Sequence, residues 1–166
     1  MSPQLTSAQT DRAAGVLLGT ACGDALGAGY EFGPPLGGNH PVTMIGGGSF
    51  GWAPGEWTDD TSMAVAIAEV TAGGGSLRDD AALDMIARRW ADWARNAQDV
   101  GNQTRAVLAS AGSQPSAKML AGAASAHHAD TGRSGGNGSL MRTAPVVLAF
   151  LHDPGELARA ARTIRR

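Results

Sequence analysis

Disulfides, membrane spans and a surplus of one charge are all missing from this 166-residue sequence. Its single cysteine, Cys22, excludes a disulfide framework within the chain and suits a reducing compartment. The small apolar neighbours of Cys22 predict a buried structural thiol. No run approaches the roughly 18 uninterrupted apolar residues of a membrane helix, and residues 1–5 do not resemble a signal peptide. We therefore expect a cytoplasmic protein.

The charge balance also excludes some partners. A formal net charge of -2 gives no indication of binding to nucleic acid or to an anionic membrane. Hydrophobic residues make up 43% of the chain and charged residues 17%, which is typical of a soluble globular protein. The length suits one domain with its own core. We expect an N-terminal tail at 1–10 and a single domain at 11–166.

Alternating strand patterns are scarce, whereas apolar residues at helical spacing recur along the chain. The sequence therefore predicts an all-α domain. Its 24 glycines cluster without a repeat, and they predict long glycine-rich loops at about 29–57 and 129–138. The expected helices are listed here: about 11–26, 61–72, 79–96, 103–111, 117–126, 141–151 and a last one from Asp153.

Three of these helices carry start signals. Ser7 or Thr10 can cap the first, and residues 76–79 (SLRD) resemble a capping box for the helix at 79–96. Asp153 can cap the last helix, because Pro154 suits a first helical position and Glu156 follows the cap by three residues.

The clearest chemical signal is the run GEWTDDTSM at 55–63. Thr58, Asp59 and Asp60 place two adjacent carboxylates and a hydroxyl just before a helix. Mg²⁺ and Mn²⁺ prefer such oxygen ligands, and the positive end of the helix dipole favours acids there. Spacing alone supports a metal site and a simple helix cap about equally.

A second signal is the glycine-rich run at 135–142 (GGNGSLMR). Gly136, Asn137, Gly138 and Ser139 precede a helix, and backbone N–H groups at such a position can hold a phosphate. Taken alone, the run is better explained as an ordinary glycine turn.

Three further acids lie in short polar contexts. Asp24 falls within the run GDALG near the end of the first helix, where burial would require a hydrogen-bonded partner. Glu31 follows that helix in a loop. Asp99 begins the run DVGNQT, which by itself is typical of a turn between helices.

The order of these motifs resembles the ADP-ribosylglycohydrolase family, which includes the dinitrogenase-reductase-activating glycohydrolases. The resemblance extends from about Asp11 to the end of the chain, and its most specific elements are TDDT at 58–61 and GNGSLMR at 136–142. It implies an all-α fold with two divalent cations, Mg²⁺ or Mn²⁺, in a cleft. The implied activity is hydrolysis that removes ADP-ribose from a modified protein side chain or a related conjugate, by attack of water at ribose C1″.

The resemblance also implies roles for individual residues. Thr58, Asp59 and Asp60 would be metal ligands, and Gly136–Ser139 would hold the pyrophosphate. Glu31 and Asp99 match the acids that act in the serine-directed and arginine-directed members, and Asp24 would support the site from behind. We expect Asp59 and Asp60 to line one cleft with Glu31 and Ser139.

One departure from the family pattern concerns length. A full member is roughly twice as long and ends with a second acidic motif, to which nothing after Arg142 is similar. We therefore expect the helices at 11–26, 61–72 and 79–96 to lack partners, and the chain to pair with a missing C-terminal half or with a second copy. The alternative function is a non-catalytic ADP-ribose-binding module or an inactive fragment.

Overall fold

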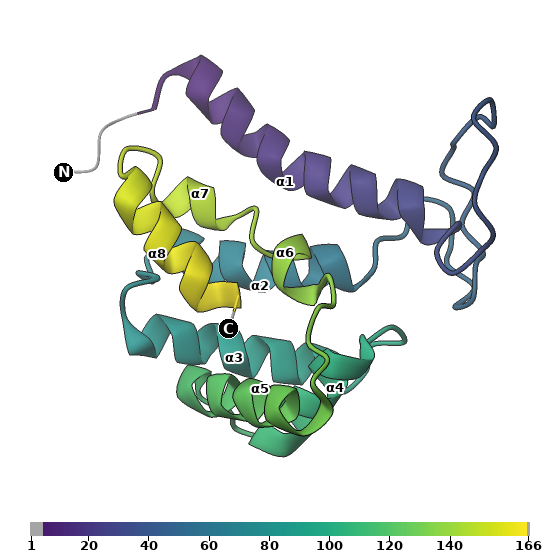
Figure 1. The fold of residues 1–166 in the computed structure, drawn as a ribbon. Coiled ribbons are helices and arrows are strands. Elements are labelled where there is room, and N and C mark those ends of the chain that lie inside the picture. The colour runs from purple at the N-terminus through teal and green to yellow at the C-terminus, as the bar shows by residue number, and fades with distance from the viewer. Residues whose placement is uncertain (1–4, 166) are drawn as a thin grey trace. The chain divides into compact units, whose positions relative to one another are not determined.

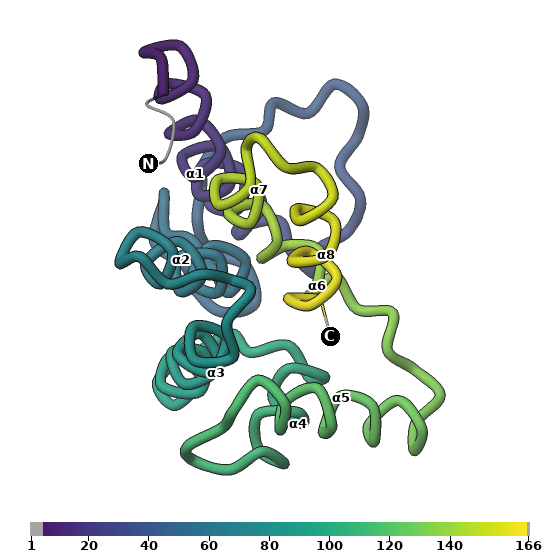
Figure 2. Tube along the Cα trace, turned by 90° about the vertical axis from the view of Figure 1, so that its left-hand side faces the viewer, coloured from purple at the N-terminus to yellow at the C-terminus, as the bar shows by residue number. Residues whose placement is uncertain are grey.

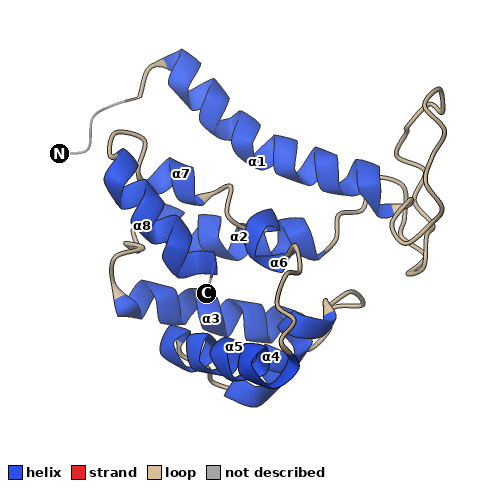
Figure 3. Ribbon diagram, in the orientation of Figure 1, coloured by secondary structure: helices blue, strands red, loops and turns tan. Residues whose placement is uncertain are grey.

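Helices joined by loops make up the computed structural model, which describes residues 5–165 (Figures 1 and 3). No strand is assigned within these residues, where an isolated antiparallel bridge joins Gly47 to Trp52. The all-α prediction is confirmed. In this described part no helix has the length and apolar character that crossing a membrane requires. The helices are α1 (Ser7–Ala28), α2 (Asp59–Ala72), α3 (Asp80–Ala94), α4 (Asn102–Ala111), α5 (Ala117–Thr131), α6 (Gly138–Met141), α7 (Val146–Ala149) and α8 (Pro154–Arg165).

The chain divides into two compact units, Met1–Thr61 and Ser62–Arg166. The first unit contains α1, which starts with a capping box: the Thr6 hydroxyl accepts from the Gln9 N–H, and the Gln9 side chain accepts from the Thr6 N–H. The cap is therefore Thr6 and neither Ser7 nor Thr10. Residues 7–10 are helical and do not belong to a tail, while residues 1–4 of the predicted tail lie outside the described part.

The long glycine-rich loop predicted at 29–57 is present, and it is fastened to the end of α1. The Tyr30 hydroxyl donates to the Thr43 carbonyl at 3.0 Å and accepts from the Thr43 N–H at 3.1 Å. Gly29 lies so close to Gly46 that a Cβ on Gly29 would come within 2.2 Å of the Gly46 carbonyl oxygen. Gly46 itself has φ +64, a conformation that favours glycine. Glycine is required at both positions.

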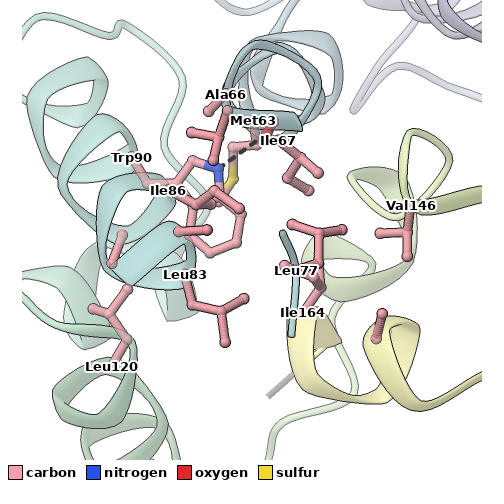
Figure 4. Packing of buried hydrophobic residues seen from close by; sticks show 14 of the residues in the cluster. Met63, Ala66, Ile67, Leu77, Leu83, Ile86, Trp90, Leu120, Val146 and Ile164 are labelled. Carbon is pink, nitrogen blue, oxygen red and sulfur yellow. Dashed lines mark hydrogen bonds between the residues drawn. The ribbon is translucent and has the colours of Figure 1, made fainter. Parts of the chain in front are cut away.

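The second unit encloses an apolar core (Figure 4). Met63 and Ile67 on α2 and Ile86 on α3 are almost fully buried, and the Trp90 indole N–H donates to the Met63 carbonyl at 3.0 Å. Helices α4 and α5 pack against each other, α5 packs on α3, and α8 contacts both α6 and α7 (Figures 1 and 2). The predicted apolar faces of the helices at 61–72 and 79–96 are thus covered within the chain itself, and the expectation that they lack partners is wrong.

In the first helix the predicted burial of Cys22 is not observed. Ala25 and Ala28 are buried, but Leu18 is 64% exposed and Cys22 is exposed. The prediction of a buried thiol is therefore wrong. Small neighbours in the sequence report the composition of a helix face but not whether another segment covers it.

Three predicted boundaries also change. The capping box at 76–79 is absent, because α3 begins at Asp80 and the Ser76 hydroxyl accepts instead from the Arg78 N–H in a turn. Of the helix predicted at 141–151, only Met141 at the end of α6 and residues 146–149 of α7 are helical, since Pro145 has no N–H and disfavours helical backbone at the residue before it. Helix α5 continues to Thr131, which shortens the second glycine-rich loop. The cap of α8 is confirmed, with Asp153 Oδ1 accepting from the Glu156 N–H at 2.9 Å.

Candidate active site

Asp24 joins α1 to the start of α2 within the first unit. Its Oδ2 accepts from the backbone N–H of Thr58 and from that of Thr61, each at 3.0 Å, and its Oδ1 accepts from the Thr58 hydroxyl at 2.7 Å. The first turn of a helix leaves its N–H groups without internal partners. Asp24 supplies acceptors for two of these groups from 34 and 37 residues away in the sequence. It therefore caps α2 and fixes where that helix begins.

Asp59 and Asp60 are the first two residues of α2, and both are half-buried. The Thr58 hydroxyl also lies 3.4 Å from Asp59 Oδ1, and acidic side chains in the first turn of a helix interact favourably with the positive end of the helix dipole. Because Asp24 holds the backbone on either side of this pair, it limits how far the two carboxylates can move.

Two threonine hydroxyls beside the acidic pair are buried. Thr58 is 5% exposed and Thr61 is 3% exposed, and the Thr61 Oγ1 has no hydrogen-bond partner among the described residues. A buried hydroxyl without a hydrogen-bond partner costs folding free energy, so the Thr61 oxygen is suited to bind a cation or another polar group. Carboxylate and hydroxyl oxygens form a donor set that suits a hard divalent cation. Within residues 5–165, however, no group of three or more His, Cys, Asp or Glu residues is placed to hold a metal ion.

Glu31 lies in the turn that follows α1, and it is exposed. Its neighbour Phe32 has φ +61, which is uncommon for a residue with a side chain, and is 73% exposed. The Phe32 and Phe50 rings meet edge to face at 6.3 Å, and Phe50 contacts the buried Trp52. The residue directly after the candidate acid therefore contacts an aromatic group that includes the buried Trp52.

The glycine-rich run Gly136–Ser139 lies in the second unit, against the start of α4. A Cβ on Gly136 would lie 3.5 Å from the Gln103 side-chain oxygen, and one on Gly138 would lie 3.4 Å from the Thr104 hydroxyl. Gly138 and Ser139 are half-buried and open α6, whereas Gly136 and Asn137 are exposed. The run thus meets the polar end of another helix.

Asp99 lies three residues before Asn102, the first residue of α4, and is 8% exposed. The Arg105 guanidinium donates to the carbonyl of the adjacent Val100 at 3.2 Å, which holds this turn to the helix that follows. Two motifs that are separate in the sequence, 98–104 and 135–142, therefore come together at the start of α4. Sequence reasoning did not identify Gln103 as the contact between them, although both Gln103 and Thr104 lie within the quoted run at 98–104.

The candidate residues are thus distributed over both units. Glu31, Asp59 and Asp60 belong to the first, whereas Asp99 and Gly136–Ser139 belong to the second. That Asp59 and Asp60 line one cleft with Glu31 and Ser139 stays a prediction.

Comparison with known proteins gives a consistent result. The family model for ADP-ribosylglycohydrolase matches residues 5–166. An ADP-ribosylarginine hydrolase of Pseudomonas putida is 37% identical over 148 residues, which are 86% of this chain and 37% of that protein. An ADP-ribosyl-dinitrogen reductase glycohydrolase of Rhodospirillum rubrum is 36% identical over 154 residues, which are 89% of this chain and 47% of that protein.

A solved structure described as an ADP-ribosylglycohydrolase-related protein complex superimposes with a TM-score of 0.62 at 36% identity. The match covers 94% of this chain and 49% of the solved one. The chain therefore spans half or less of the length of each of these proteins.

Proposed function

Because the chain belongs to the ADP-ribosylglycohydrolase family, we propose that it takes part in the metal-dependent removal of ADP-ribose from a modified protein side chain or a related ADP-ribosyl conjugate. Water attacks the ribose C1″ carbon, the bond from C1″ to the side chain breaks, and the leaving group takes up a proton. The names of the two bacterial relatives favour a protein substrate, such as one modified on arginine.

Thr58, Asp59 and Asp60 are the residues we assign to two divalent cations, Mg²⁺ or Mn²⁺. Such ions, when bound, orient hydroxyl groups and lower the pKa of water. The observation that carries this assignment is the Asp24 cap, because it holds two half-buried carboxylates side by side at the start of one helix. If Asp59 and Asp60 only capped α2 at the surface, buried hydroxyls at Thr58 and Thr61 would not be needed. A third carboxylate, Asp24 from α1, would not be needed either.

The roles of the remaining residues follow from their chemistry. Gly136–Ser139 offer backbone N–H groups and a hydroxyl for the pyrophosphate, in a run without side chains at Gly136 and Gly138 to obstruct it. Glu31 and Asp99 are the candidate proton-transfer groups. Asp99 is the more restrained of the two, since it is buried and lies in a turn held by Arg105.

The first test is a substitution of one proposed ligand. Asp59→Asn keeps the size of the side chain but removes a charge, so we expect hydrolysis of ADP-ribosylarginine in the presence of Mn²⁺ to fall by at least about 100-fold. Calorimetric Mn²⁺ binding should weaken in parallel. Asp79→Asn is the matched control, because Asp79 also precedes a helix but is exposed and forms no cap bond. Equal losses in both variants would contradict the assignment.

The second candidate is a non-catalytic module that binds ADP-ribose. It is favoured by the contact of the glycine-rich run with Gln103 and Thr104, because that surface is built from one unit alone. Calorimetry with ADP-ribose, with and without Mn²⁺, separates the two functions. Metal-independent binding with no turnover would support the module, whereas metal-dependent turnover would support the enzyme.

A further inference from the structure

The loop at 29–57 exposes a group of apolar side chains near the end of α1. Phe32 is 73% exposed, Ile45 is 53% exposed, Val42 is 49% exposed, and Met44 is exposed as well. Single exposed apolar residues are common on proteins, whereas a group of them marks a place where another molecule binds. We call these four residues the apolar loop surface.

Contacts within the first unit hold the apolar loop surface together. Thr43, whose two chain neighbours both belong to this surface, forms two hydrogen bonds with the Tyr30 hydroxyl, and Phe32 is two residues from Tyr30. Ile45 reaches the end of α1, since a Cβ on Gly29 would lie 3.0 Å from its Cγ1. Two segments of the loop therefore offer their apolar side chains to the same partner. Because their backbone is held in place beforehand, binding loses little conformational entropy.

The apolar loop surface lies at the same end of α1 as the candidate metal ligands. Glu31 immediately precedes Phe32, and the loop leads into Thr58 at its other end. Asp24, about one helical turn before Ala28, accepts from the Thr58 hydroxyl at 2.7 Å, which holds the end of the loop to α1. Figure 1 shows the loop at this end of α1. A molecule that covers the loop is therefore close to residues that we assign to the reaction.

The charge of this part of the chain has one sign. Lysine and arginine are absent from residues 13–77, whereas the loop contains two exposed acids, Glu31 and Glu56. An acidic surface attracts basic segments and repels acidic ones. The loop therefore suits a polypeptide in which lysine or arginine lies next to an apolar side chain.

We propose that the apolar loop surface docks the polypeptide that carries the ADP-ribosylated side chain. An apolar residue of that polypeptide packs on Phe32 and Val42, and a neighbouring basic residue faces the acids of the loop. This inference rests on the proposed function, because it assigns a contact to the substrate of that function. It adds that the substrate is recognised through residues beside the modified one and not through ADP-ribose alone.

The experiment uses the whole 166-residue chain and synthetic peptides of about 10 residues, roughly 30 Å long when extended. The reference peptide has a central arginine flanked by leucines and lysines. Without any modification, it should shift the amide NMR signals of the loop at 29–57. Replacing its leucines by serines should weaken binding at least about tenfold, because the apolar contact is lost. Replacing its lysines by glutamines should weaken binding about two- to fivefold, and this smaller effect should disappear at high salt.

Variants of the chain locate the contact. Phe32→Asn suits the φ of +61, since asparagine adopts this conformation more readily than most residues, and it should weaken the reference peptide at least about tenfold. The variant should also respond less to the loss of the peptide's leucines, because their partner is absent. Val42→Asn is a second variant with the same expected direction. Leu18→Gln is the control, since Leu18 is 64% exposed on α1 but lies outside the loop. Thermal melts establish that each variant folds.

Kinetics in Mn²⁺ separate this inference from the proposed function. The ADP-ribosylated reference peptide should have a KM at least about tenfold below that of ADP-ribosylarginine, which is too small to cover the loop. Phe32→Asn should remove this difference with kcat unchanged, because a contact equal in the ground state and the transition state affects KM. Turnover of ADP-ribosylarginine without any advantage for the peptide would overturn the docking and leave the proposed function standing. Loop shifts with the peptide but no turnover of either substrate would support the docking surface and overturn the proposed function.

Other results would assign the loop to a different occupant and overturn the proposal. Self-association of the chain that Phe32→Asn abolishes would assign it to a second copy. Loop shifts caused by the portion of the Rhodospirillum rubrum relative outside its match to this chain would assign it to that portion. Binding of the reference peptide that Phe32→Asn and Val42→Asn leave unchanged would place the peptide elsewhere on the chain.

Discussion

The two units hold their candidate residues by different means. In the first, a single carboxylate on α1 binds the N–H groups of Thr58 and Thr61, and two glycines allow the backbone of the loop to approach α1. In the second, an apolar core that includes Ile67, Ile86 and Val146 supports the helices around the glycine-rich run. Polar contacts of the first kind are directional and local, whereas apolar burial acts through many neighbours at once. The comparison predicts that substitutions in the two units will differ in how much they lower the free energy of unfolding and in how far along the chain their effects extend.

The largest effect is expected in the core of the second unit. Ile86→Ala removes a side chain that is 1% exposed and leaves a cavity, which should lower the free energy of unfolding by about 2–5 kcal/mol. Chemical denaturation monitored by circular dichroism measures this loss. The neighbouring Met85 is 42% exposed, so Met85→Ala should change stability by no more than about 0.5 kcal/mol. Similar losses for both would show that the core is not packed as described.

A smaller and more local effect is expected in the first unit. Asp24→Ala removes the acceptor atoms of all three hydrogen bonds, at a cost of about 1–3 kcal/mol. Hydrogen exchange of the Thr58 and Thr61 amides should accelerate, while that of the α3 amides stays unchanged. Asp11→Ala is the control, because Asp11 is exposed on the same helix. Slow exchange at Thr58 and Thr61 in the variant would refute the capping role.

The smallest effect concerns the surface of the second unit. Hydrogen bonds from Arg78 and then Arg159 lower the pKa of Glu156 below its ordinary value of 4.5. The ionised form is thereby favoured in the folded state, so the stabilisation is present above pH 4.5 and is lost as pH falls through the lowered folded value. Because Arg78 is exposed to solvent, which screens its interaction with Glu156, the contribution is small.

Glu156→Gln should therefore flatten the acid side of the stability curve only slightly. Urea unfolding at a series of pH values from neutral to acid measures the slope. An unchanged slope below pH 4.5 would mean that the Arg78 contact is not maintained in solution.

The sequence predicts this structure well where contacts are local. The apolar stripe of α3 and the cap of α8 are correct, because a helix face and a cap depend on residues three or four positions apart. The cap of α2 was not predictable in the same way, since Asp24 and Thr58 are 34 residues apart. The exposure of Cys22 was missed for a related reason: the residues around a position in the sequence do not say which segment covers it.

The candidate site divides in the same way into residues that local sequence identifies and contacts that only the tertiary structure shows. The sequence identified Thr58, Asp59 and Asp60 as a chemical group, and the structure adds the buried hydroxyl of Thr61 beside them. It identified Asp99 and Gly136–Ser139 as separate runs, but only the fold brings both to the start of α4. Which polar residues are buried depends on tertiary packing and cannot be obtained from spacing.

The two hydrogen bonds between the Tyr30 hydroxyl and the Thr43 backbone have a practical consequence for engineering. They close the twelve residues between Tyr30 and Thr43 into a loop whose two ends are held together. Gly37 and Gly38 lie at exposed positions of this loop, and a Cβ at either would meet no atom within 4 Å. Lengthening a closed loop at such a point costs little entropy. The position between these two glycines is therefore the place in the first unit at which to insert an epitope or a fluorescent label.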